Sequence, residues 1–127
     1  MLLRFTTAVI SMLLLSGCFA SLVPKRVVTV GKSSILVGNE AVKQEWKCKK
    51  VGGGGYMSNA SAVFGVYIGD NVQVVTQKAG DKFAKETAKA GGNYVDMDFV
   101  RGANAASAYD TIPPVNAKYY NCKKLPE

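Results

Sequence analysis

Residues 70–93 read DNVQVVTQKAGDKFAKETAKAGGN and carry the clearest helix signal in this 127-residue chain. Asp70 followed by Gln73 resembles a capping box, and Gly91-Gly92-Asn93 is typical of a left-handed helix end. Lysines occupy the polar faces, while apolar side chains recur near helical spacing at Val72, Val75, Ala79, Phe83 and Ala90. The pattern predicts one long helix over about 71–90.

The residues after this helix alternate in the manner of a strand. Over 94–100 the carboxylates of Asp96 and Asp98 are expected outside, and the side chains expected inside are Val95, Met97 and Phe99. Two carboxylates on one strand face invite an acid–base interpretation. The chain has no histidine and offers no companion nucleophile, so we interpret both as solvated surface groups.

Three further segments have strand character: 26–30, 44–51 and 117–123. A fourth, 35–37, is ambiguous, and we favour a short strand followed by a turn. In 44–51 the alternation predicts an inner face that holds Trp46 and Cys48. In the last segment Cys122 is expected in a core-facing row.

Gly52-Gly53-Gly54-Gly55 predicts a flexible turn or a bulged strand end. These glycines do not match a nucleotide-binding loop, because neither a Lys-Ser/Thr pair nor a helix follows directly. Residues 63–68 fit either a strand or an apolar loop packed over the domain. Residues 101–114, rich in Ala, Gly, Asn, Ser and Pro, predict a mobile loop.

Together these elements predict an α+β fold, with one main helix packed on a small, mainly antiparallel sheet. No internal repeat and no break in composition marks a second domain.

The N-terminal 17 residues have the composition of an export signal. Arg4 precedes an apolar run that ends in two small residues before Cys18. A transmembrane helix requires roughly 20 predominantly apolar residues, and this run is shorter. Leu13-Leu14-Leu15-Ser16-Gly17-Cys18 resembles the lipobox of bacterial lipoprotein precursors. The resemblance implies removal of residues 1–17 and fatty acylation of Cys18, and Phe19 in place of an aspartate implies the periplasmic face of the outer membrane.

Processing would leave a lipidated tether over 18–25 and a single periplasmic domain over 26–127. A domain of this size buries only about two thirds of its unfolded surface and is marginally stable alone. Cys48 and Cys122 remain as an even pair in an oxidising compartment, so we expect a disulfide between them. The alternative is a pair of metal ligands, but two thiolates without histidine do not fill a tetrahedral site. We expect no metal and no cofactor.

The chain is strongly basic, with 16 Lys and Arg against 9 Asp and Glu. A disulfide would bring two groups of lysines into one cationic patch: Lys43, Lys47, Lys49, Lys50, Lys118, Lys123 and Lys124. Such a patch would attract lipopolysaccharide phosphates, anionic peptidoglycan groups or an acidic envelope protein. The alternative is that these lysines only solubilise the outer face of two strands. The expected periplasmic location and the lack of a basic motif interleaved with aromatic residues argue against nucleic-acid binding.

The motifs also carry a resemblance to a known family. Cys48-x-x-Val51-Gly52, the run from Ala84 to Gly92-Asn93-Tyr94-Val95, and Tyr120-x-Cys122 look like a group of small enterobacterial lipoproteins of unassigned function. That group is similar in turn to the envelope-stress lipoprotein RcsF, although the additional cysteines and the proline-rich linker of RcsF are missing here. The resemblance implies a compact α+β domain with an intramolecular disulfide and no enzymatic activity.

We therefore expect a membrane-anchored, non-enzymatic lipoprotein that binds another envelope component or takes part in envelope-stress sensing. One alternative is an inhibitor of a lysozyme-like enzyme, which would use the loop over 101–114. A cell-wall hydrolase is the other alternative, but no triad or lytic signature assembles a catalytic site in the sequence.

Overall fold

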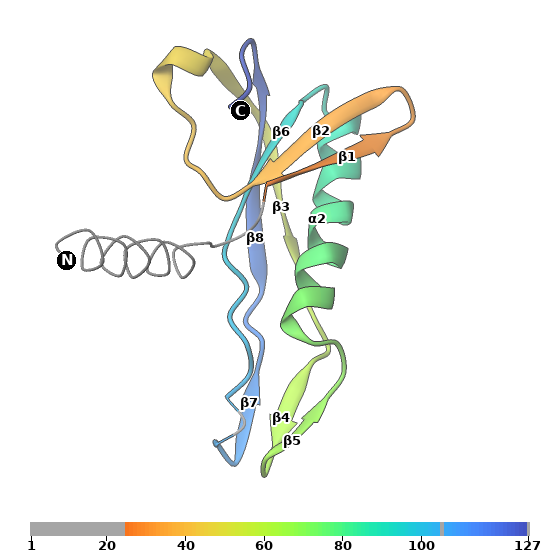
Figure 1. Cartoon of the computed structure of the whole chain (residues 1–127), viewed down its shortest axis with the longest axis vertical. Coiled ribbons are helices and arrows are strands. Elements are labelled where there is room, and N and C mark those ends of the chain that lie inside the picture. The colour runs from red at the N-terminus through yellow and green to blue at the C-terminus, as the bar shows by residue number, and fades with distance from the viewer. Residues whose placement is uncertain (1–24, 105, 127) are drawn as a thin grey trace, which may run out of the picture.

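A computed structural model describes residues 25–104 and 106–126. The signal segment 1–17 and Cys18, the expected lipidation site, lie outside the described residues, as does the tether up to residue 24. One α-helix and two sheets form an elongated α+β molecule over the described ranges (Figure 1). The expected fold class is confirmed.

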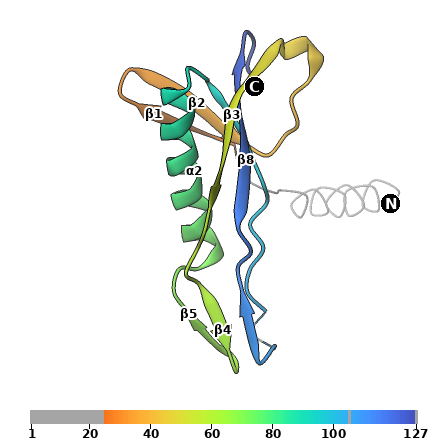
Figure 2. The ribbon, with the colours of Figure 1, turned by 180° about the vertical axis from the view of Figure 1, so that it is seen from behind.

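The larger sheet has five strands in the order β1-β2-β6-β8-β3. Their bounds are Arg26–Val30 (β1), Ser33–Gly38 (β2), Tyr94–Met97 (β6), Val115–Cys122 (β8) and Cys48–Tyr56 (β3). Neighbouring strands are antiparallel except β2 and β6, which are parallel. The connection between this parallel pair includes helix α2 (Val72–Lys89), which lies along one face of the sheet (Figure 2).

The main core lies between α2 and this face of the sheet. Val75, Ala79 and Phe83 of the helix are fully buried, as the helical spacing predicts. The sheet contributes Ile35, Val37, Val95, Met97, Ala117 and Tyr119. Gly80 allows a close approach, because a side chain there would lie 2.7 Å from the Arg26 guanidinium, which itself forms an ion pair with Asp81.

The helix begins one residue later than the capping-box pattern predicts. Asn71, not Asp70, is the N-cap, and its side-chain oxygen accepts a hydrogen bond of 2.9 Å from the Val74 backbone N–H. Asp70 instead forms an ion pair of 2.7 Å with Lys78. The expected role of Asp70 is therefore wrong, because the asparagine amide supplies an equally suitable acceptor at the position where the backbone turns helical.

Among the described residues, those that follow β2 cover the opposite face of the sheet near one end. Trp46 and Tyr94 pack there with ring centroids 5.9 Å apart, together with Leu36 and Cys122. The expected strand over 44–51 is wrong in its first half, where Gln44–Trp46 form a 3-10 helix. Lys47 then adopts a left-handed conformation with φ of 51°, which turns the chain into β3 at Cys48.

Strand β3 continues through the four glycines instead of ending there. Its pairing with β8 shifts between Lys50 and Gly52, before the glycines, and the ladder then runs through them to Tyr56. The expected flexible turn or bulged strand end at the glycines is therefore wrong, because their backbone pairs with β8. Gly54 is required by the packing. A Cβ at this position would collide with the Tyr119 hydroxyl and lie 2.6 Å from a Glu86 carboxylate oxygen.

A second sheet, at the far end of the long axis, has the strand order β5-β4-β7. Its strands are Ser61–Val63 (β4), Val66–Ile68 (β5) and Tyr109–Thr111 (β7). The apolar stretch over 63–68 is therefore neither one strand nor a loop. It contains the last residue of β4, a turn at Phe64 and Gly65, both with positive φ, and the whole of β5.

Strand β6 ends at Met97, so the expected strand over 94–100 is too long. Beyond it, Phe99 is 58% exposed, which contradicts its expected place in the core. The expected mobile loop over 101–114 is also incorrect, because it contains β7 and the buried Ile112. Among the described residues, no helix is both long and apolar enough to cross a bilayer.

Candidate functional site

The expected disulfide joins the first residue of β3 to the last residue of β8. Cys48 and Cys122 are directly opposite each other in the ladder and are bonded, with a sequence separation of 74. Cys122 is buried beside Trp46 and Tyr94. The backbone N–H of Lys123 also donates to the Trp46 carbonyl over 3.1 Å, so the last strand is tied to the 3-10 turn as well.

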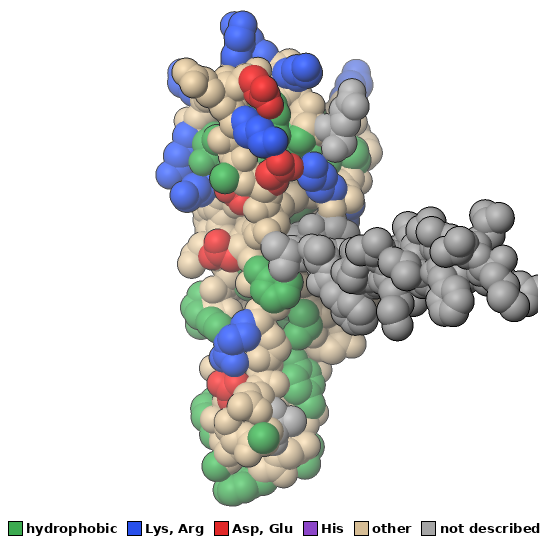
Figure 3. Space-filling view, turned by 60° about the vertical axis from the view of Figure 1, so that its left-hand side comes forward, with side chains coloured by type: hydrophobic (Ala, Val, Ile, Leu, Met, Phe, Trp, Pro, Cys, Tyr) green, Lys and Arg blue, Asp and Glu red, His purple; other side chains and the backbone are tan. Residues whose placement is uncertain are grey.

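This junction gathers five exposed lysines, which we call the basic end: Lys47, Lys49, Lys50, Lys123 and Lys124. Lys49 and Lys50 are the residues of β3 that directly follow Cys48. Lys123 and Lys124 directly follow Cys122, the last residue of β8. None of the ion pairs among the described residues includes any of these five. Figure 3 shows Lys and Arg side chains concentrated at the upper end of the molecule.

Two of the seven lysines expected in the patch are placed differently. Lys43 forms an ion pair of 3.5 Å with Glu40 and lies 5.7 Å above the Trp46 ring, so its charge is partly compensated. Lys118 lies on β8, opposite Gly53 of β3. It is four residues before Cys122 and therefore about 13 Å away from that cysteine along the strand. The fold does not bring Lys118 to the basic end.

Acidic groups beside the basic end are few and partly neutralised. Lys25 donates to Glu40 over 2.9 Å, and this hydrogen bond, helped by Lys43, lowers the pKa of the Glu40 carboxyl below its usual value. Glu45 is exposed on the 3-10 turn and bounds an open hollow of about 510 Å³ together with Lys43 and Gln44. The local surface stays predominantly positive.

The two strand carboxylates lie in a hollow of about 320 Å³ with Gly54, Asn116, Ala117 and Lys118. Burial raises the pKa of Asp96, and the neighbouring Lys118 opposes this effect. Asp98 accepts a hydrogen bond of 3.2 Å from the Asn116 backbone N–H, so it fastens the chain after β6 to the start of β8. The hollow contains two carboxylates, an amide and an amine, and no serine, threonine or cysteine is among the residues that line it.

The opposite end of the molecule is apolar. Its five exposed side chains, which we call the apolar tip, are Phe64, Val66, Tyr67, Ile68 and Tyr109. Phe64 is 81% exposed and Tyr109 66%. They are neighbours in the small sheet, because Phe64 donates its backbone N–H to the Ala108 carbonyl over 3.1 Å. Hydrophobic side chains are visible at this lower end in Figure 3.

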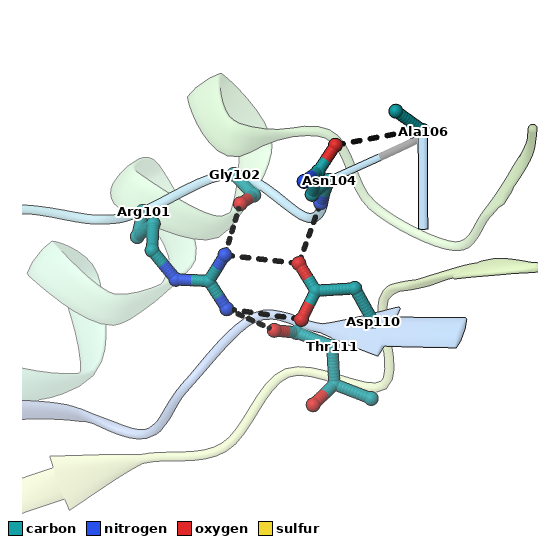
Figure 4. Close-up of polar contacts among 6 residues, drawn as sticks. All are labelled: Arg101, Gly102, Asn104, Ala106, Asp110 and Thr111. Carbon is teal, nitrogen blue, oxygen red and sulfur yellow. Dashed lines mark hydrogen bonds and ion pairs between the residues drawn. The ribbon is translucent and has the colours of Figure 1, made fainter. Parts of the chain in front are cut away.

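A bidentate ion pair fastens the strand β7 behind this tip (Figure 4). The Arg101 guanidinium donates to both carboxylate oxygens of Asp110, over 2.9 and 3.2 Å, and to the Thr111 carbonyl over 2.8 Å. Asp110 also accepts from the Asn104 backbone N–H. The hydrogen bonds from Arg101 and Asn104 hold the pKa of Asp110 well below its usual range.

Comparison with known proteins assigns this chain to no family. No protein-family model, curated protein or solved structure matches the chain. The resemblance to small enterobacterial lipoproteins therefore stays a prediction.

Sequence reasoning located the disulfide and the lysines around it but missed the apolar tip. The available signal was the run Val63-Phe64-Gly65-Val66-Tyr67-Ile68, which is too apolar for an ordinary surface loop. A central glycine within such a run is typical of a tight turn between two short strands.

Proposed function

We propose that this protein is a lipid-anchored, non-enzymatic binding module on the periplasmic face of the outer membrane, and that its basic end binds an anionic envelope component. The observation that carries the proposal is the set of five exposed lysines at the disulfide junction. Lys49 and Lys50 lie on β3, and Lys123 and Lys124 directly follow β8, so the disulfide fixes the backbone positions of these lysines without a ligand. Less conformational entropy is then lost when an anion binds.

The anchor part of the proposal is supported by the sequence before the domain. Leu13–Cys18 resembles a lipobox, and several fatty chains on one residue make membrane attachment effectively permanent. The motifs around Cys48 and Cys122 add support for a lipoprotein of the envelope-stress group, in which binding, not turnover, would be the activity.

The binding part can be tested with defined anionic probes on the full chain in detergent. We expect the double variant Lys47→Glu/Lys49→Glu to bind phosphorylated lipopolysaccharide, peptidoglycan or poly-glutamate about tenfold more weakly than wild type, which corresponds to about 1.4 kcal/mol. The matched control is Lys32→Glu/Lys85→Glu, which reverses the same charge at exposed positions elsewhere. Equal binding by both double variants, or no binding of wild type to any probe, would contradict the proposal.

The anchor is tested separately by metabolic labelling with a clickable fatty acid. Wild type should incorporate the label and Cys18→Ala should not, and equal labelling would show that Cys18 is not the attachment site.

A further inference from the structure

The apolar tip has no covering element among the described residues, although it carries five hydrophobic side chains. Phe64, Val66 and Ile68 are each more than half exposed. Contiguous apolar surface of this kind marks a binding surface in a soluble domain. The tip is a convex end of an elongated molecule (Figure 1), so its occupant must accept a protruding hairpin.

Charge at the tip is neutralised within the protein. The polar residues behind it form two ion pairs, Arg101 with Asp110 and Lys78 with Asp70. The Tyr67 hydroxyl donates to the Asp70 carbonyl over 2.8 Å, so its polar atom is also satisfied internally. A tip of this kind, with aromatic and aliphatic side chains outward and no uncompensated charge, is suited to the boundary between lipid headgroups and acyl chains.

The tether limits how far the anchor can lie from the domain. Lys25, the first described residue, forms an ion pair with Glu40, and β1 begins at the next residue, Arg26. The seven residues from Cys18 to residue 24 span at most about 25 Å. An anchor at Cys18 would therefore keep the domain close to the bilayer.

A second copy of the chain fits the tip less well. The edge strands β5 and β7 have three residues each, which is shorter than the typical strand of about five or six residues. Little backbone pairing is available for strand addition.

We propose that the apolar tip inserts shallowly into the bilayer that holds the lipid anchor, and that the basic end consequently points away from that bilayer. This inference rests on the proposed function only for the presence of the anchor. It adds an orientation: the lysines face the periplasm and its anionic components, not the phospholipids beneath the domain.

The single tryptophan provides a matched reporter, because Trp46 lies beside the disulfide at the opposite end. The full lipidated chain is reconstituted into phosphatidylethanolamine–phosphatidylglycerol vesicles with brominated acyl chains, which quench tryptophan on contact. In the variant Trp46→Phe/Phe64→Trp we expect roughly a twofold loss of emission, as for a side chain buried in the interface. Wild-type Trp46 should keep its emission. If Trp46→Phe does not fold, Phe64→Trp with Trp46 retained gives the same comparison against wild type.

The outcomes of this experiment distinguish a failure of the tip inference from a failure of the anchor. Flotation of the protein with vesicles but no quenching at position 64 would overturn the tip inference alone. Equal quenching of both reporters would overturn it too, since the domain would then lie flat on the membrane. Sedimentation as a dimer with the position-64 reporter shielded in detergent would assign the tip to a second copy. Failure of wild type to float would instead reject the anchor.

Discussion

Gly54 shows how closely helix and sheet approach each other in this protein. The Tyr119 hydroxyl donates to the Glu86 carboxylate across the interface between β8 and α2, over the place where a Gly54 side chain would stand. Burial of Tyr119, together with its bond to Glu86, raises the pKa of the tyrosine above its usual range. The glycine run thus serves packing as well as strand formation.

We expect Gly54→Ala to destabilise the domain by about 1–3 kcal/mol, the usual effect of overpacking. Gly55→Ala is the matched control, because its Cβ would come no closer than 3.3 Å to the Asn116 side chain and 3.8 Å to the Val115 carbonyl oxygen. The measurement is urea unfolding of both variants with the disulfide intact. Equal midpoints would show that Tyr119 and Glu86 can move aside.

Long elements of this fold are predictable from the sequence, and short ones are not. Helix α2 covers five turns, so its apolar period is unmistakable, although the sequence pattern predicts the N-cap at Asp70 and not at Asn71. The strands β4, β5 and β7 have three residues each and cannot display a period. The glycines of β3 lack any strand propensity, and only the ladder with β8, distant in sequence, makes them extended.

The same contrast holds for the candidate site. The disulfide follows from counting cysteines in an export context, and the lysines beside it follow from the disulfide. The expected place of Lys118 in the patch is wrong, because four residues of extended strand separate it from Cys122 by about 13 Å. The apolar tip depends on the pairing of β4 with β7, which no local pattern indicates.

Strand β7 should respond to acid through Asp110. Its carboxyl has a pKa below the usual 3.8 in the folded protein, so the ion pair with Arg101 stabilises the fold above that value. This stabilisation is lost as the pH falls through the lower folded pKa. A carboxyl titration by NMR should therefore give a midpoint below 3.8, and Arg101→Gln should move it back toward the usual value. A wild-type midpoint at or above 3.8 would contradict the bidentate geometry.

The molecule as a whole has two unlike ends joined by the ladder of β3 and β8. One end carries the disulfide and the lysines of the basic end, and the other carries the small sheet with the apolar tip (Figure 3). The ladder, with α2 along it, connects these two ends. Its integrity therefore contributes to the fixed separation of the two ends.

Reduction of the disulfide should weaken the entire domain. Closing a loop of 74 residues removes about 4.5 kcal/mol of unfolded-state entropy at 25 °C in the chain-entropy model. We expect the urea midpoint to fall markedly in reductant, and the Cys48→Ser/Cys122→Ser variant to match reduced wild type. An unchanged midpoint would mean that β3 and β8 are held by their ladder and packing alone.

The order of strands has a consequence for the way the chain folds during synthesis. Strand β8 lies between β6 and β3, so β3 has no partner in the larger sheet until β8 has been made. The nine residues of β3 therefore stay unpaired in that sheet while α2 and the small sheet are synthesised. The Cys48–Cys122 bond also joins β3 to β8, so this topology delays both the closing of the sheet and the formation of the disulfide.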